Sequence, residues 1–245
     1  MTQIEQPQRF GDEIFAAAAG VVTRADFIRK TYLHLAGAIL AFIGLELVFF
    51  QVLDVEAITK SMLGGPYSWL IVLGAFMVVS WLAHSWANSA TSIGVQYAGL
   101  VVYVIAQAVI FVPLLVIASQ YNQIYGGHNL ITTAAVTTLT MFGGLTGFVL
   151  ISGKDFSFLR GALVIGGIAA MMMIVASYIF PFDLGIFFTI AMIALACGFI
   201  LYDTSNVLHH YRIGQHVAAS LALFASVALL FWYVLQLLMY LQGRD

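Results

Sequence analysis

Four ionisable side chains lie inside long apolar stretches of the sequence: His34, Glu46, His84 and Asp203. Imidazole groups titrate near neutral pH, and the protonation of a carboxyl group responds strongly to burial and to neighbouring charges. Residues of these types in apolar surroundings could therefore take up and release protons, or line the path of a cation. Whether they can act together depends on the elements that carry them, which the rest of the sequence predicts.

Charged residues are scarce in the chain and unevenly placed. Of 245 residues, 62% are apolar and 8% are charged, whereas roughly a quarter of an ordinary soluble domain is charged. Residues 61–153 contain no Asp, Glu, Lys or Arg. Because no water-soluble fold hides so long a run from solvent, the sequence predicts an integral membrane protein.

The same counts exclude other classes of protein. The net charge is -2, and no basic stripe offers the positive surface that nucleic-acid binding needs. Cys197 is the single cysteine, so it forms neither an intrachain disulfide nor a thiolate metal site, and its apolar surroundings indicate an inert buried thiol. Because the early residues lack the apolar core of a cleavable signal peptide, we expect the first membrane span to act as an uncleaved signal-anchor.

Seven segments are long and apolar enough to cross a bilayer as helices, which requires about 20 residues each. They are continuous apolar runs without the alternation of a β-barrel, so we predict an all-α integral membrane protein, a seven-transmembrane-helix bundle. Residues 1–30 form a predicted cytoplasmic N-terminal segment, and residues 31–245 the membrane domain. The predicted spans are 31–53, 67–86, 96–119, 130–152, 161–179, 184–203 and 217–241.

Local signals mark several ends of these helices. Thr23-Arg24-Ala25-Asp26 has the form of a capping box, which predicts that the first helix starts in water before it enters lipid. Gly64-Gly65-Pro66 breaks the chain before the second span. We expect a tight hairpin after the fifth span, in which Pro181 stops one helix and Asp183 caps the next. Pro113 falls within the third span and should kink it.

Basic residues in the loops predict how the bundle is oriented in the membrane. With the N-terminus in the cytoplasm, Lys60 and Arg244 lie on the outer side and all other basic residues lie on the inner side. Since Lys and Arg favour the cytoplasmic side, we predict an N-in/C-out topology. The inner basic residues are Arg9, Arg24, Arg29, Lys30, Lys154, Arg160 and Arg212.

This topology sorts the ionisable residues by depth. His34, His84 and Asp203 fall near the inner ends of their spans and could form one polar cluster, joined by histidines of the loop that follows the sixth span. Glu46 lies 12 residues beyond His34, about 18 Å along a helix, and so belongs near the opposite face. The loop histidines are His209, His210 and His216.

Each of these residues also has a purely structural interpretation. His34 and His84 could be interfacial side chains with one hydrogen bond each, and the loop histidines could simply be solvated. Asp203 could cap its helix or pair with Arg212. Glu46 could be protonated and bonded to a neighbour, or reach outward to water.

Two motifs carry a resemblance to a known family. Residues 153–161 read Gly-Lys-Asp-Phe-Ser-Phe-Leu-Arg-Gly, and residues 198–204 read Gly-Phe-Ile-Leu-Tyr-Asp-Thr. In this pair of motifs the chain resembles the Bax inhibitor-1 family, with its bacterial, YccA-type branch as the nearest match. The resemblance begins at Phe27-Ile28-Arg29-Lys30-Thr31-Tyr32 and continues to the seventh span. The family's compact bundle of seven helices agrees with the span count above.

The resemblance implies a multispan regulator of stress survival and cell death, surrounded by the lipid of a bacterial inner membrane. Several members of the family act as pH-sensitive calcium leak channels. Calcium would then be a transported ion, and we expect no resident cofactor. The YccA-type branch is linked to the membrane protease FtsH, so the alternative is a non-conducting modulator of such a protease.

In calcium-conducting members, an aspartate in the Tyr-Asp-Thr motif pairs with a second aspartate on the last helix, and this pair controls a closed pore. Two carboxyl groups that share a site can act as a proton-dependent latch. By resemblance, Asp203 matches the first position, and Ser226 stands at the second. The latch is therefore incomplete here, and His34 or His84 beside Asp203 is a better candidate for a proton switch.

Two enzyme classes share fragments of sequence with this chain. Tyr202-Asp203 matches one half of the intramembrane aspartyl proteases, but the Gly-x-Gly-Asp motif of the other half does not occur. Ser80-x-x-x-His84 matches an element of seven-helix zinc hydrolases that cleave lipid amides. So short a pattern often arises by chance, and His210 and His216 do not share a helix face. We expect no enzymatic activity, with the zinc-dependent hydrolase as the lesser alternative.

Overall fold

The computed structural model describes residues 15–89, 92–125, 129–180 and 182–243. In these residues the chain forms eight α-helices and two short 3-10 helices, and no strand. All α-helices except α2 are long and apolar enough to cross a membrane. The helices are η1 (Ala16–Ala18), α1 (Val21–Val52), α2 (Val55–Leu63), α3 (Ser68–Ala87), α4 (Ile93–Tyr125), α5 (Leu130–Ser152), η2 (Ser157–Leu159), α6 (Arg160–Ile179), α7 (Gly185–His209) and α8 (His216–Gln242).

The predicted fold class and the seven predicted spans are confirmed. The predicted span 130–152 coincides with α5. The largest differences are at α1, which begins at Val21 instead of residue 31, and at the ends of α4 and α7, which continue to Tyr125 and His209 instead of ending at residues 119 and 203. All three extensions contain polar residues, because a helix can continue into water where the apolar run has ended.

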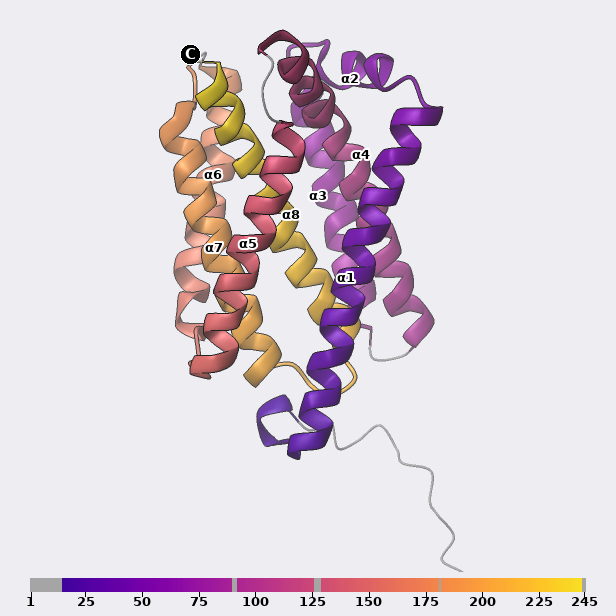
Figure 1. Cartoon of the computed structure of the whole chain (residues 1–245), viewed down its shortest axis with the longest axis vertical. Coiled ribbons are helices and arrows are strands. Elements are labelled where there is room, and N and C mark those ends of the chain that lie inside the picture. Colours follow the sequence, from indigo (N-terminus) through magenta and orange to yellow (C-terminus); the bar gives the residue numbers. More distant parts are fainter. Residues whose placement is uncertain (1–14, 90–91, 126–128, 181, 244–245) are drawn as a thin grey trace, which may run out of the picture.

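Helix α2 replaces part of a predicted loop between the first two spans. The Asp54 side chain accepts a hydrogen bond from the backbone N–H of Ala57 at 3.0 Å and so caps the helix. Glu56 in the first turn and Lys60 in the last turn complement the helix dipole. Figure 1 shows this short helix lying across one end of the bundle. It ends before Gly64-Gly65-Pro66, which breaks the chain as predicted.

The predicted capping box at the start of α1 is wrong. Gly20 occupies the cap position, and no side chain bonds to the first turn there. Asp26 instead forms an ion pair with Lys30, one turn further along, with 2.7 Å between Oδ2 and Nζ. The helix nevertheless begins well before its apolar run, and Figure 1 shows its first turns extending past the ends of the other helices.

The connection between α6 and α7 is short, as predicted, because α6 ends at Ile179 and α7 begins at Gly185. Pro181 lies outside the described residues. The predicted cap by Asp183 is wrong, since Leu184 occupies the cap position and no side-chain cap bond forms. Helix α4 continues through Pro113, and the kink expected there stays a prediction.

Helices α4 and α8 form the centre of the bundle. In their most apolar stretches 67% and 61% of residues are buried, against 28% or less in the other spans. Helix α8 packs against α1, α3, α4, α5 and α7, and Figure 1 shows it passing through the middle of the bundle in yellow. The outer helices expose apolar side chains such as Leu40, Ile71 and Phe187, as expected for helices that face lipid.

The described parts of α1 and α8 place the beginning and the end of the bundle at opposite ends (Figure 1). We call the end where α1 begins the proximal end, and the other the distal end. The proximal end also contains the ends of α3, α5 and α7 and the beginnings of α4, α6 and α8. Which end faces the cytoplasm stays a prediction.

Gly99 allows α3 and α4 to approach each other closely. A Cβ atom at this position would lie 2.5 Å from the carbonyl oxygen of Ala83 and 2.7 Å from the amide nitrogen of Ala87. The two backbones are therefore in contact, as small residues permit in membrane bundles. This contact fixes His84, which follows Ala83 on α3, relative to Tyr103 on α4.

Candidate functional site

Asp203 on α7 and Ser226 on α8 face each other inside the bundle. The Ser226 Oγ donates a hydrogen bond to the Asp203 Oδ2 at 2.5 Å. Both residues are buried, with 8% and 5% exposure. The two positions that hold a pair of aspartates in the resembled family are thus in contact in this chain. A carboxylate and a hydroxyl can form one charge-assisted hydrogen bond, but two carboxyl groups can share a proton.

His84 is connected to Asp203 only through Tyr103. The Nδ1 of His84 donates to the Ser80 carbonyl at 2.8 Å, and its ring packs edge-on against the Tyr103 ring with 5.3 Å between centroids. Tyr103 is buried and within electrostatic range of the Asp203 carboxyl group. The described contacts include no direct hydrogen bond between His84 and Asp203. If these two residues form the predicted proton switch, they interact through Tyr103 and not by direct contact.

His34 belongs to a second group, at the proximal ends of α1, α4 and α8. Its Nδ1 donates to the Lys30 carbonyl at 2.7 Å, and its Nε2 accepts from the Tyr97 hydroxyl at 2.7 Å. The His216 ring lies 4.9 Å from the His34 ring, centroid to centroid. Both imidazoles are half-buried. The single predicted cluster is therefore divided, with His34 and His216 in one group and Asp203 in another.

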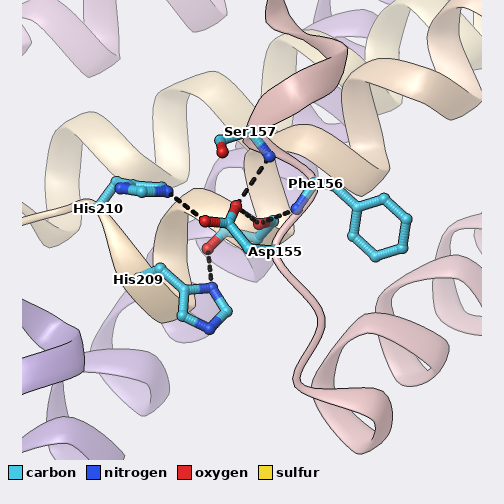
Figure 2. Close-up of polar contacts among 6 residues, drawn as sticks. Asp155, Phe156, Ser157, His209 and His210 are labelled. Atoms are coloured by element: carbon cyan, nitrogen blue, oxygen red, sulfur yellow. Dashed lines mark hydrogen bonds and ion pairs between the residues drawn. The ribbon is translucent and has the colours of Figure 1, made fainter.

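A third group joins the first motif of the family resemblance to residues that follow the second motif on α7 (Figure 2). Asp155 Oδ1 accepts hydrogen bonds from the Ser157 backbone N–H at 2.8 Å and from Ser205 Oγ at 3.1 Å. Its Oδ2 pairs with His210 Nε2 at 3.1 Å. Ser205 Oγ in turn accepts from the Phe156 backbone N–H at 2.8 Å. We call these contacts the Asp155 clamp, which fastens the loop after α5 to the end of α7.

The Asp155 carboxylate is firmly ionised. The backbone N–H of Ser157 above all, and the side chains of Ser157, Ser205 and His210, lower the pKa of Asp155 to about 2. Sequence reasoning missed its role, although Asp commonly forms an Asx turn, in which its side chain accepts from the backbone N–H two residues on. His209, which Figure 2 also shows, donates from Nδ1 to the Ser205 carbonyl at 3.0 Å.

Arg212 lies at the surface, after the end of α7. Its guanidinium carbon is 5.5 Å from the centroid of the Phe15 ring, within the range of a cation–π contact. The neighbouring Tyr211 carbonyl accepts from the Ala16 backbone N–H at 2.9 Å. Burial first, and then the carboxylate of Asp203, raise the pKa of Tyr211. The α7–α8 loop thus holds the beginning of the described chain against the proximal end.

Glu46 is the most isolated of the predicted site residues. It lies in α1, toward the distal end, and is 7% exposed. Within the described part of the chain, neither of its carboxyl oxygens has a hydrogen-bond partner. It therefore neither reaches water nor bonds to a described neighbour, contrary to its structural interpretation. A buried acid without a partner is costly, so Glu46 keeps its place as a candidate for a function.

A cavity of about 770 Å³ lies between α3, α4, α6, α7 and α8. It extends from the distal ends of these helices to Tyr103, Phe199 and Ala225. Ala225 precedes Ser226, and Phe199 lies one helical turn before Asp203. Gln107 also lines the cavity, and its amide oxygen is buried without a partner among the described residues. The deep end of the cavity is therefore close to the Asp203–Ser226 hydrogen bond.

The sequence left open whether the protein binds a metal ion. In the ranges that the structure describes, no three His, Cys, Asp or Glu side chains are grouped closely enough to hold a metal ion. The Ser80-x-x-x-His84 element uses its imidazole for the Ser80 carbonyl and for packing on Tyr103. Nothing in these contacts supports the zinc hydrolase alternative.

Comparison with known proteins gives a family and several relatives. Residues 24–243 match the family described as inhibitor of apoptosis-promoting Bax1. Protein LIFEGUARD 4 of Arabidopsis thaliana is 28% identical over 215 residues, which cover 85% of this chain and 82% of that protein. Bax inhibitor 1 of Schizosaccharomyces pombe is 33% identical over 119 residues, 48% of this chain and 45% of that protein.

A bacterial relative, the uncharacterized protein PA2604 of Pseudomonas aeruginosa, is 28% identical over 130 residues. This alignment spans 53% of this chain and 58% of the relative's length. The family match, in contrast, spans nearly the whole described chain and includes both motifs and the Asp155 clamp. The chain is a multi-pass membrane protein that belongs to the Bax inhibitor-1 family.

Proposed function

We propose that this protein is a pH-sensitive leak channel for calcium or another cation in a bacterial inner membrane. The observation that carries the proposal is the cavity, which extends from the distal end to Phe199 and Ala225, near the Asp203–Ser226 hydrogen bond along α7 and α8. A path that is open on one side and closed by a single bond between two helices is what a gated leak requires. The proposal assigns no catalytic residue and no resident cofactor.

The groups along this path suit a cation. No Lys, Arg or His lies among the described residues that line the cavity. Gln107 offers an amide oxygen without a partner, and oxygen atoms are the ligands that calcium prefers. A cation that reached the deep end would next meet Asp203.

The Asp203–Ser226 bond would act as the latch between α7 and α8. An ionised Asp203 accepts a charge-assisted hydrogen bond worth about 1.5–3 kcal/mol, whereas a neutral hydrogen bond is worth about 0.5–1.5 kcal/mol. Protonation of Asp203 would therefore weaken the latch by about 1 kcal/mol, or roughly fivefold in the ratio of closed to open channels. Leak should increase as the pH falls, with a smaller response than a pair of aspartates would give.

Calcium flux into proteoliposomes between pH 6 and 8 tests this proposal. We expect flux above that of empty vesicles, rising toward pH 6, and higher flux at pH 8 in Ser226→Ala, because the latch is lost. Ser220→Ala is the matched control, since Ser220 is also buried on α8 but donates to the Val217 carbonyl of its own helix. Flux equal to that of empty vesicles at every pH, unchanged by Asp203→Ala, would refute the leak.

A second candidate function is the non-conducting modulation of a membrane protease of the FtsH type. It is favoured by apolar side chains that are exposed before the membrane span of α1 begins. Val21 and Val22 are 86% and 83% exposed there, and Phe15 is 49% exposed. Deletion of residues 2–22, or the milder double change Val21→Ser with Val22→Ser, should abolish co-purification with the protease. Unchanged co-purification would count against this role, whatever the flux assay gives.

A further inference from the structure

The lining of the cavity differs from the rest of the chain in its aromatic content. Of the 33 residues that line it, 11 are Phe, Trp or Tyr, whereas these residues make up 14% of the sequence. Trp69 on α3 and Trp232 on α8 stack with 5.9 Å between ring centroids. Phe188 and Tyr233 meet edge to face, 6.1 Å apart. A ligand in this cavity would therefore contact many aromatic rings.

The charges around the cavity favour a ligand of one sign. Among the described residues around the cavity, Asp183 is the one that carries a full charge, and it lies near the distal end. Deeper in, the unpartnered amide oxygen of Gln107, whose residue is 6% exposed, adds a partial negative charge. The faces of aromatic rings are also negative and attract cations. These features favour a positive ligand and oppose an anion.

The position of the cavity gives access from the bilayer. Helix α3 packs chiefly on α4, and α6 packs on α7. The two pairs line opposite sides of the cavity, and α8 lies between them. All five are long and apolar enough to span a membrane, so the cavity lies among membrane spans, at the depth that a molecule partitioning into lipid would reach. The volume of about 770 Å³ is in the usual range for pockets that hold drug-sized ligands.

We propose that this cavity binds lipophilic organic monocations, such as phosphonium or quaternary ammonium ions with apolar substituents. The apolar substituents would contact the aromatic rings and methionines of the lining. The positive centre would lie against the faces of aromatic rings, where the partial negative charge of the Gln107 amide oxygen would also attract it. This binding site goes beyond the calcium leak and does not depend on it.

The probe for this site is tetraphenylphosphonium, and its control is tetraphenylborate, an anion of nearly the same size and shape. Binding to the purified protein in detergent is measured by equilibrium dialysis and by the quenching of tryptophan fluorescence. We expect saturable binding of the cation and no saturable binding of the anion. Equal binding of both ions would overturn the proposal, because apolar contact alone would then explain it.

Variants locate the bound cation. Trp232→Leu should weaken binding by roughly 5- to 30-fold, the range expected for a desolvated cation–π contact. Trp81→Leu is the matched control, because Trp81 lies on α3 but is 70% exposed and does not line the cavity. If the two variants bind the cation equally well, the site is not in the cavity.

A second pair of variants tests the same site in case Trp232→Leu does not fold. Gly167 lines the cavity, and a Cβ atom there would meet no atom within 4 Å. Gly167→Leu should therefore place its side chain in the cavity and weaken saturable binding. Gly144→Leu on α5 has equally open surroundings but lies outside the cavity, and it should bind as the parent does. Full binding by Gly167→Leu would also refute the proposal, with melting temperatures confirming that both variants are folded.

Discussion

Gly99→Ala should force α3 and α4 apart and loosen the contact between His84 and Tyr103. The added methyl group would lie 2.5 Å from one backbone atom of α3 and 2.7 Å from another. Because ordinary contacts are about 3.5–4 Å and backbone atoms cannot turn aside, the helices must separate by roughly 1 Å. Such overpacking costs about 1–3 kcal/mol, and the better helix propensity of alanine offsets about 1 kcal/mol. The expected net loss is therefore between zero and about 2 kcal/mol.

Gly74→Ala is the matched control, because Gly74 lies on α3 and a Cβ atom there would meet nothing within 4 Å. Thermal unfolding in one detergent compares the two variants with the parent. At roughly 2–4 °C for each kcal/mol in a chain of this size, Gly99→Ala should melt below the parent, by up to about 8 °C. Gly74→Ala should melt at or above it. If both variants melt at the same temperature, the two backbones are not in contact and the reasoning fails.

Three further predictions concern charges and orientation. The pKa of Asp155, about 2, is below its ordinary value of 3.8, so the clamp's contribution to stability is complete above about pH 5 and is lost progressively as the pH falls through 2. Unfolding measured across this range should show a smaller acid-induced loss in Asp155→Asn than in the parent. Glu46→Gln should melt at or above the parent temperature, because it replaces a buried acid without a described partner by a neutral side chain of the same shape; a clear drop would mean that the carboxyl group has an important contact. Alkaline phosphatase fused after residue 243 should be active, and a fluorescent protein that folds only in the cytoplasm should be dark, if the topology is N-in/C-out.

The sequence was sufficient for the membrane spans because a bilayer sets a fixed length for an apolar helix. That is why the predicted span 130–152 coincides with α5. The same criterion could not find α2, which is too short to span and lies across the distal end. Its start at Asp54 and its charges at Glu56 and Lys60 are the signals of a surface helix, and they could have identified it.

The sequence predicted how far along its span each candidate residue lies, but not which neighbouring side chain it contacts. His34, His84 and Asp203 all lie toward the proximal end, as their positions in the predicted spans indicated. Their partners depend on the rotation of each helix about its axis, which packing decides and which apolar runs on nearly every face do not reveal. His34 faces Tyr97, and His84 faces Tyr103. The contact between Asp203 and Ser226 was accessible only through the family resemblance.

The central position of α8 has a consequence for how the protein is made. Ribosomes deliver the spans to the membrane in chain order, so the other six spans are synthesised before the helix that most of them pack against. Until α8 inserts, Asp203 lacks the hydroxyl group of Ser226 inside lipid, and the partly built bundle has a vacant centre. Translation that stalls before residue 216 would leave six inserted helices that membrane quality control should recognise as unfinished. We therefore expect six inserted spans without α8 to be degraded faster than the bundle that contains it.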